Sequence, residues 1–320
     1  MLCILPETSD PFFCLAAEEF LLKTYSEDIF MLWQSHDTVV VGKHQNAMAE
    51  IDYRYFRENG IRLARRISGG GTVFHDKGNV NFTFIKNVAG PQEISFKRFT
   101  QPIVDVLAGM GVQAETSGRN DLLVAGKKIS GNAEHVFKNR VLHHGTLLYQ
   151  SNLDNLGRAI RVIPGKYAGK AVQSNRSVVD NITGYLREPL STEDFIIRIL
   201  GEQLEKSADN LFHSLNASET EQIRSLSRQK FETWEWQFGY SPAYRFKNQI
   251  TVKQGTLNIQ AEFEKGRFTA VKIEGSCFSG RETDVIQKVL IGLPHQYESV
   301  LEAYQEAGIH PGEDLIYAWF

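Results

Sequence analysis

The chain has 320 residues, 42% of them hydrophobic, which is enough for one large and one small domain that each bury a core. Its 35 Lys and Arg against 38 Asp and Glu give a net charge of −3, with no basic block to indicate a nucleic-acid partner. Three widely separated cysteines, Cys3, Cys14 and Cys277, argue against a disulfide framework and a structural zinc site. The chain shows no signal-peptide pattern and no apolar stretch near the roughly 20 residues of a spanning helix. We therefore expect a cytoplasmic protein without membrane association.

The first part of the chain predicts one helix followed by several short strands. Asp10 and Pro11 form an N-cap and a first-turn proline, and the apolar residues after them predict a helix to about Tyr25. A second helix is predicted over 96–111, where the pattern ends at glycine. The strands are predicted over 28–34, 38–44, 61–67, 71–76 and 79–85, the last with clear alternation of apolar and polar residues.

The rest of the chain predicts more strands, a helix and a compositionally distinct end. Strands fill 120–150, with turns at Gly126 and near Lys138, and Ser191 opens a helix over 191–207 with a capping-box pattern. From Tyr244 the sequence is a meander of short alternating strands, with turns at Gln254-Gly255 and Lys265-Gly266, followed by two helical segments. These elements predict an α+β protein with a catalytic domain over 1–243 and a small α+β accessory domain over 244–320.

A glycine-rich stretch stands out in ARRISGGGTVFHDKGN, residues 64–79. Three consecutive glycines follow Arg65 and Arg66 and precede His75 and Asp76. A tight hairpin would need only one or two glycines, and glycine loses the most backbone freedom on folding. We therefore favour a backbone laid against a ligand, with its N–H groups facing an anion and an arginine fork holding a phosphate or carboxylate.

The common phosphate-binding motifs do not explain this stretch. The chain has no GxxxxGK[ST] sequence, because Gly118 and Gly126 are too far apart and Lys127 is followed by another lysine. It also has no GxGxxG sequence that enters a helix. The sequence therefore excludes a P-loop protein and a Rossmann protein, and any nucleotide is held by a different device.

A second group of polar residues lies in GRNDLLVAGKKISGNAEHV. Lys127 and Lys128 sit at a glycine turn between short strands, shortly after Asp121. One interpretation is an exposed basic hairpin, which is common on protein surfaces. The other is a lysine that points inward as a fixed positive charge on an acyl-phosphate centre, with Asp121 as a candidate Mg²⁺ ligand. The pattern alone leaves both open.

Two adjacent histidines, His143 and His144, occur in LHHGTLL. Neighbouring residues on a strand point to opposite faces, so the two cannot chelate one metal together. We expect one of them to line a pocket and the other to pack or to face solvent.

These motifs resemble the lipoate–protein ligase A family, together with DPFFCLAAEEFLL, AVQSNRSVVDNIT and TWEWQFG. The resemblance is nearly continuous from about Asp10 to Pro242, and it is looser from Tyr244, where the family has its C-terminal accessory domain. It implies the fold of biotin–protein ligases, a mixed β-sheet flanked by helices. It also implies two reactions: lipoate and ATP form lipoyl-AMP, and the acyl group then passes to a lysine of a lipoyl domain.

The resemblance also implies roles for single residues. Arg66 is similar to the family's phosphate-binding arginine, and Lys128 to the catalytic lysine that touches both the lipoate carboxylate and the α-phosphate, with Lys127 as the alternative. The stretch from Gly169 to Asn181 resembles the loop that closes over the adenylate. The implied ATP and lipoyl-AMP site consists of Arg66, Gly71, Thr72, Val73, Phe74, His75, Asp76 and Lys128. The implied lipoate site consists of Arg66, Ser68, Gly70, Gly71, Lys128, His144 and Gly145.

The resemblance implies ATP, Mg²⁺ and lipoate as ligands, and Asp121 is the candidate Mg²⁺ ligand among the residues noted above. The implied acceptors are lipoyl-domain proteins, namely E2 subunits of 2-oxoacid dehydrogenases and the glycine cleavage H protein, and we expect a monomer. Three alternatives remain open at this point. They are a lipoyl or octanoyl transferase that makes no adenylate, a biotin ligase, which lacks support because its GRGRxGR-type loop is absent, and a binding module without enzymatic activity.

Overall fold

The structure, a computed structural model, describes residues 1–117, 120–161, 163–174 and 177–320. Within these ranges no helix is both long and apolar enough to cross a membrane. The α-helices are α1 (Pro11–Thr24), α2 (Ala47–Glu50), α3 (Tyr53–Glu58), α4 (Phe96–Gly109), α5 (Leu153–Ala159), α6 (Thr192–Glu205), α7 (Ala217–Leu226), α8 (Gly280–Leu290), α9 (Tyr297–Glu306) and α10 (Glu313–Tyr317). Short 3-10 or π-helical turns are η1 (Pro91–Glu93), η2 (Ile182–Tyr185), η3 (Ser227–Phe231) and η4 (Glu235–Gly239).

The strands follow the predicted order and add several short ones. They are β1 (Leu2–Ile4), β2 (Ile29–Trp33), β3 (Thr38–Val41), β4 (Arg62–Arg65), β5 (Val73–His75), β6 (Asn79–Asn87), β7 (Glu115–Thr116), β8 (Asp121–Val124), β9 (Lys127–Phe137), β10 (Arg140–Leu148), β11 (Tyr167–Gly169), β12 (Leu211–Phe212), β13 (Tyr244–Val252), β14 (Gly255–Glu264) and β15 (Arg267–Gly275). Local signals produced the expected boundaries: the Asp10 carboxylate accepts the amide hydrogens of Phe12 and Phe13 at the start of α1.

The described chain forms two compact units. The first consists of Met1–Lys43, Arg62–Gly157 and Asn175–Glu232, and the second of His44–Ile61, Arg158–Ser174 and Thr233–Phe320. Segments from the first half of the sequence therefore belong to the second unit. The domain division between residues 243 and 244 stays a prediction.

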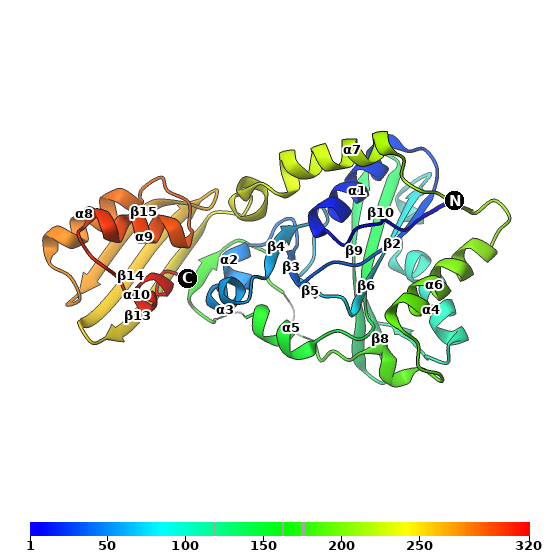
Figure 1. Cartoon of the computed structure of the whole chain (residues 1–320), viewed down its shortest axis with the longest axis horizontal. Coiled ribbons are helices and arrows are strands. Elements are labelled where there is room, and N and C mark those ends of the chain that lie inside the picture. The colour runs from blue at the N-terminus through cyan, green and yellow to red at the C-terminus, as the bar shows by residue number, and fades with distance from the viewer. Residues whose placement is uncertain (118–119, 162, 175–176) are drawn as a thin grey trace. The chain divides into compact units, whose positions relative to one another are not determined.

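The first unit is built on an eight-stranded mixed sheet in the order β12-β1-β2-β6-β10-β9-β8-β7. β1 pairs parallel with β2 and β12, and the remaining neighbours are antiparallel. Figure 1 shows α4 and α6 on one side of the long strands and α1 on the other. This confirms the predicted α+β class with a mixed sheet flanked by helices.

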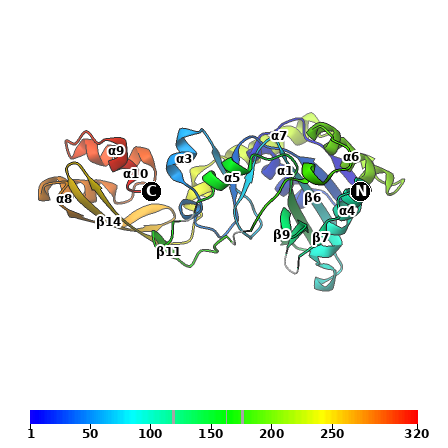
Figure 2. The same ribbon diagram turned by 90° about the horizontal axis from the view of Figure 1, so that it is seen from below.

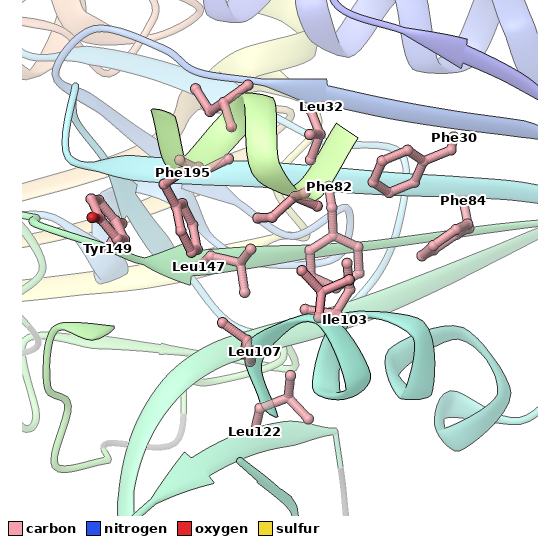
Figure 3. Close-up of a cluster of buried hydrophobic side chains, with 14 of the residues drawn as sticks. Phe30, Leu32, Phe82, Phe84, Ile103, Leu107, Leu122, Leu147, Tyr149 and Phe195 are labelled. Carbon is pink, nitrogen blue, oxygen red and sulfur yellow. The ribbon is translucent and has the colours of Figure 1, made fainter. Parts of the chain in front are cut away.

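The two faces of the central strands differ in chemistry because side chains alternate along β6. Val80, Phe82 and Phe84 lie in a large apolar core, which α4 and α6 complete with side chains such as Phe99 and Phe195. Figure 3 shows Phe82, Phe84 and Phe195 among the side chains that pack between the strands and the helices.

The opposite face of β6 carries Asn79, Asn81 and Thr83, and all three are buried although they are polar. Buried polar groups need hydrogen-bond partners, so this face cannot be an ordinary core. It supplies one wall of the candidate site.

A three-stranded sheet in the order β4-β3-β5 carries the glycine stretch, which connects β4 to β5. β3 pairs parallel with β4 and antiparallel with β5. The stretch passes so close to β3 that a Cβ atom on Gly42 would overlap the Gly70 carbonyl oxygen. Gly70 itself has φ +90°, a conformation open to glycine and strained for other residues.

The second unit contains a four-stranded antiparallel sheet in the order β11-β13-β14-β15. Figure 2 shows α8, α9 and α10 beside this sheet. The predicted turns at Gly255 and Gly266 are present, and both glycines have positive φ. β11, which sequence patterning did not predict, joins the edge through the pairing of Tyr167 with Phe246.

A buried histidine, His295, lies at the centre of the second unit's core. Its ring stacks on Phe263 with 4.2 Å between centroids. Nε2 donates to the Trp319 carbonyl oxygen at 2.6 Å, so Nδ1 is free to accept the Tyr244 hydroxyl hydrogen at 2.8 Å. These contacts fit a neutral imidazole, and burial lowers the pKa of His295 to about 3.

We predict that acid destabilises the protein partly through His295. Between its unfolded pKa of 6.5 and its folded pKa of about 3, the unfolded chain binds a proton that the folded chain does not. The free energy of unfolding therefore falls as the pH drops through this window, by about 1.4 kcal/mol per pH unit for this group. Urea unfolding between about pH 7 and about pH 5 measures the slope. His295→Gln should make the slope shallower, whereas His310→Gln, at an exposed position, should not; equal slopes in all three proteins would contradict this account.

Candidate active site

The side chain of Arg66 holds the backbone of the three glycines that follow it, Gly69 to Gly71. Its guanidinium is buried and donates from Nη2 to the carbonyl oxygens of Gly69 and Gly71, both at 2.7 Å. Nη1 donates to the Val40 carbonyl oxygen at 3.1 Å, and Nε donates to Ser68 Oγ at 3.0 Å. Burial lowers the pKa of Arg66 to about 10, so the group remains charged at neutral pH. Four of its five N–H groups are used by the protein, and one on Nη1 remains.

The carbonyl groups of Gly69 and Gly71 point toward Arg66, and the amide groups of the three glycines have no such partner. The N–H groups of Gly69, Gly70 and Gly71 find no acceptor among the residues that the structure describes. Gly70 is exposed and its two neighbours are half-buried, so ligands can reach these amides. Successive unpaired amides beside a buried cation are typical of an anion-binding site.

A chain of hydrogen bonds connects Ser68 to a buried carboxylate on α1. Because Ser68 Oγ accepts from Arg66, its hydrogen is directed to His144 Nε2, 2.6 Å away. His144 Nδ1 then donates to Glu18 at 2.9 Å, and Thr83 Oγ1 donates to the same carboxylate at 2.5 Å. Trp33 Nε1 donates to Thr83 at 3.3 Å. Every donor in the network therefore points toward Glu18, which is fully buried.

His75 and Asp76 follow the stretch at the end of β5 and differ in their bonding. The ring of His75 is buried in a T-shaped contact with Trp33, and its Nε2 has no partner among the described residues. Burial and the nearby charge of Arg66 lower the pKa of His75 to about 3, so this ring is neutral. Asp76 instead supports the backbone: its carboxylate accepts the amide hydrogens of Gly78 at 2.9 Å and Asn152 at 2.6 Å.

Lys128 lies near the start of β9 and forms an ion pair with Asp121 of β8. Nζ lies 2.9 Å from Asp121 Oδ1, and both side chains are about one-fifth exposed, at 22% and 20%. A Cβ atom on Gly131 would come within 2.9 Å of Lys128 Nζ, so the absence of a side chain there makes room for the ammonium. An ammonium has three N–H groups, and Asp121 uses one of them.

The lysine and the glycine stretch share one face of β9. Gly131 faces Lys128 Nζ, and Ala133 Cβ lies 3.8 Å from the position of a Cβ on Gly70. Gly131 and Ala133 are two apart on the strand and point to the same side, about 7 Å from each other. A register shift between β8 and β9 next to Lys128 brings the lysine side chain to that side as well. The free amides above Arg66 and the ammonium of Lys128 therefore lie on the same side of the sheet.

Lys127 points elsewhere and forms an ion pair of its own. Its Nζ lies 2.7 Å from Asp180 Oδ2, and its side chain is 49% exposed. Of the two neighbouring lysines, Lys128 is therefore the one that shares the face of the glycine stretch.

His143 and Gly145 lie on the face of β10 that is turned away from His144. His143 stacks on Phe99 at 5.1 Å and bonds Glu134 at 2.9 Å within the apolar core. A Cβ atom on Gly145 would overlap Asn132 Oδ1, so core packing already requires glycine there. The expected role of Gly145 in lipoate binding stays a prediction.

Two sequence expectations fall partly outside the described residues. The segment from Gly169 to Asn181 includes residues 175 and 176, and the motif that contains Asp121 includes residues 118 and 119. Of the residues expected to contact the nucleotide, Thr72 precedes β5 and is half-buried, and Val73 and Phe74 lie in β5, half-buried and buried respectively.

Sequence reasoning missed Glu18, Trp33 and Thr83. A signal for Glu18 exists, because a carboxylate stands among apolar residues at three- and four-residue spacing in α1, where 11 of 14 residues are buried. A charge on such a helix face requires a buried partner. Trp33 and Thr83 carry no comparable signal, since both are common strand residues.

The chain matches two family models. That of the lipoyl protein ligase A/B catalytic domain matches residues 10–203, and that of the bacterial lipoate protein ligase C-terminus matches residues 241–311. Lipoate–protein ligase 1 of Staphylococcus aureus is 36% identical over 304 residues, which cover 94% of this chain and 92% of that protein.

Solved structures give the same picture. A lipoate–protein ligase A bound with ATP has a TM-score of 0.63 at 25% identity, covering 75% of this chain and 98% of that chain. A bipartite lipoate protein ligase, studied with its E2 lipoyl domain from Thermoplasma acidophilum, has a TM-score of 0.64 at 25% identity, covering 75% of this chain and 96% of that one.

The fold and the matched models define a ligase with a catalytic domain and a C-terminal accessory domain. The chain belongs to the lipoyl protein ligase A/B family, and it is an enzyme of the lipoate–protein ligase kind.

We predict that Glu18→Gln destabilises the protein. A glutamine at this position would offer an N–H group to Thr83 or to His144, which are both donors. One buried donor would be left unpaired, at a cost of about 1–3 kcal/mol in the free energy of unfolding. Urea unfolding measures the loss. The control is Glu205→Gln on exposed helix surface, which should stay within about 0.5 kcal/mol of the wild type. Equal stability of the Glu18→Gln variant and the wild type would contradict the network.

Proposed function

We propose that this chain is an ATP-dependent ligase that attaches lipoate to acceptor proteins in two steps. In the first, a lipoate carboxylate oxygen attacks the α-phosphorus of ATP, the bond to the β-phosphate oxygen breaks, and pyrophosphate leaves. In the second, the ε-amine of an acceptor lysine attacks the carbonyl carbon of lipoyl-AMP. An amide forms, AMP leaves and the amine loses a proton.

The observation that carries this proposal is that Lys128 and the unpaired amides of the glycine stretch lie on the same face of the sheet. A carboxylate is already charged at neutral pH and needs no base. What it needs is positioning beside a phosphate that repels it, with the charges compensated. Two N–H groups of Lys128 remain beyond the bond to Asp121, which suits a cation that contacts two anions. The relatives named for lipoate and the solved structure with ATP support the same reaction.

Asp121 fits as the single protein ligand for Mg²⁺. The part of the chain that is described has no group of three His, Cys, Asp or Glu side chains able to hold a metal ion. Mg²⁺ usually takes one or two carboxylates, substrate phosphates and waters, so one carboxylate is sufficient. Bound there, it would neutralise phosphate charge.

The remaining expectations concern partners and location. We propose lipoyl domains of E2 subunits and the H protein as acceptors, supported by the archaeal ligase whose structure was studied with an E2 lipoyl domain. We also propose a cytoplasmic monomer without nucleic-acid or membrane partners.

A transferase that moves acyl groups without making an adenylate is the main alternative. A thiol-dependent version needs an accessible thiolate of low pKa. Cys3 and Cys14 are buried, and burial raises the pKa of both thiols. Cys277 is half-buried, and burial raises the pKa of its thiol as well. This favours the ligase over such a transferase.

The decisive test is mass spectrometry of a lipoyl domain incubated with the protein, lipoate and Mg²⁺. With ATP, we expect the domain to gain one lipoyl group on one lysine, and without ATP no gain. Modification by octanoyl-protein in the absence of ATP would favour the transferase instead. Free biotin should not compete, whereas competition would favour a biotin ligase.

We predict that Lys128→Met abolishes most adenylate formation. Methionine keeps much of the aliphatic stem and removes the ammonium, so the carboxylate and the phosphate face each other uncompensated. Loss of one preorganised charged contact typically costs about 100- to 1,000-fold in rate. ATP–pyrophosphate exchange with lipoate measures it. A matched control is Lys97→Met, at an exposed position on α4, which should exchange at the wild-type rate. Normal exchange by Lys128→Met would show that the lysine is misassigned.

A further inference from the structure

We propose that Asp180, Lys127 and Tyr185 form a clamp that positions Lys128 for the reaction. The proposal rests on the proposed ligase function and assigns a role to Lys127, the neighbour that the chemistry does not use. These three are positioning residues, because they act through Lys128.

The backbone of Lys128 is held by the segment 178–180. β10 pairs with β9 only as far as Gly145 opposite Asn132. Nearer the start of β9, the segment 178–180 replaces β10 as the neighbour of β9. Lys128 N–H donates to the Val178 carbonyl oxygen at 2.8 Å, and the Lys128 carbonyl oxygen accepts from Asp180 N–H at 3.0 Å. This parallel bridge provides the edge bonds of Lys128 on that side, while Leu123 of β8 pairs on the other.

Side chains fasten this bridge. The carboxylate of Asp180 accepts hydrogen bonds from Lys127 Nζ at 2.7 Å, from the Tyr185 hydroxyl at 2.8 Å and from the amide of Asn181 at 2.9 Å. Lys127 thus bonds the side chain of Asp180, and the backbone amide of Asp180 in turn bonds Lys128. Consecutive strand residues point to opposite sides, so one lysine can hold the segment while the next faces the site.

Hydrogen bonds connect the clamp to Asp76, which follows β5 at the end of the glycine stretch. Asn181 and Ser151 exchange two hydrogen bonds at 2.9 Å, between the Asn181 side chain and the Ser151 backbone. The amide of the next residue, Asn152, donates to Asp76 at 2.6 Å. An unbroken series of bonds therefore fixes Lys128 relative to Asp76, at the end of the glycine stretch.

The clamp should matter more for rate than for stability. The Lys127–Asp180 pair is partly exposed, at 49% and 29%, and such pairs contribute little to folding. Displacement of a catalytic charge by about 1 Å can nevertheless cost about 100-fold in rate. Since the glycine stretch would stay intact, the loss should appear in kcat, with KM for lipoate little changed.

The test measures ATP–pyrophosphate exchange in Asp180→Ala and Lys127→Met. We expect kcat to fall about 10- to 100-fold in each, with the double variant no worse than the singles, because both remove the same contact. Lys127→Arg should recover most of the rate. The control is Glu221→Ala, which removes a partner from the exposed Arg228–Glu221 pair of equal length, 2.7 Å, and should leave kcat unchanged.

Two further measurements separate a clamp from general destabilisation. In a Lys128→Met background, Asp180→Ala should cost no further activity, whereas an equal additional loss would overturn the proposal. Amide hydrogen exchange at Lys128 should become faster in Asp180→Ala, because the bond to Val178 is weakened. This readout does not depend on catalysis. Absence of exchange in the wild-type enzyme would count against the ligase function, and unchanged kcat and amide exchange in Asp180→Ala would count against the clamp alone.

Discussion

The burial of one guanidinium, that of Arg66, governs the arrangement of the candidate site. A buried charge is costly unless it is hydrogen-bonded, and here carbonyl oxygens of the glycine stretch accept two of the guanidinium hydrogens. By turning those carbonyls inward, Arg66 turns the amides outward. The same geometry requires glycine at position 70, where φ is +90°, and at position 42, where a side chain would collide. The arginine thus determines which residues can surround it.

The charge of Arg66 also explains the polar network behind it. Its Nε bond to Ser68 orients the hydroxyl, which orients the His144 ring, which in turn donates to Glu18. A buried cation and a buried carboxylate are therefore linked through a neutral, directional chain, and each polar atom along it has a partner. Only one face of the central sheet can accommodate this chain. The other face, with Phe82 and its neighbours, is dry and supplies the packing.

Much of this molecule could be predicted from local sequence. The N-cap at Asp10, the alternation in β6 and the turns at Gly126 and Gly255 are short-range signals, and the corresponding elements are present. The glycine stretch was identifiable because unused glycines are entropically costly. β11, in contrast, is three residues long and exists only through its pairing with β13. The partner of Glu18 was equally out of reach, because His144 is 126 residues away in the sequence.

The two adjacent lysines show why the sequence left their roles open. Both are flexible cations beside a glycine turn, and local patterning gives them the same environment. Strand geometry separates them, because successive side chains leave opposite sides of β9, and a register shift in its pairing with β8 puts Lys128 rather than Lys127 on the side of Gly131. Lys128 then meets Asp121 and the space above Gly131, while Lys127 meets Asp180, which lies 53 residues further along the chain. Because Asp180 also bonds the backbone of Lys128, the second lysine is part of the support of the first. A lysine pair at a strand start can in this way combine a reacting charge and its support within two residues.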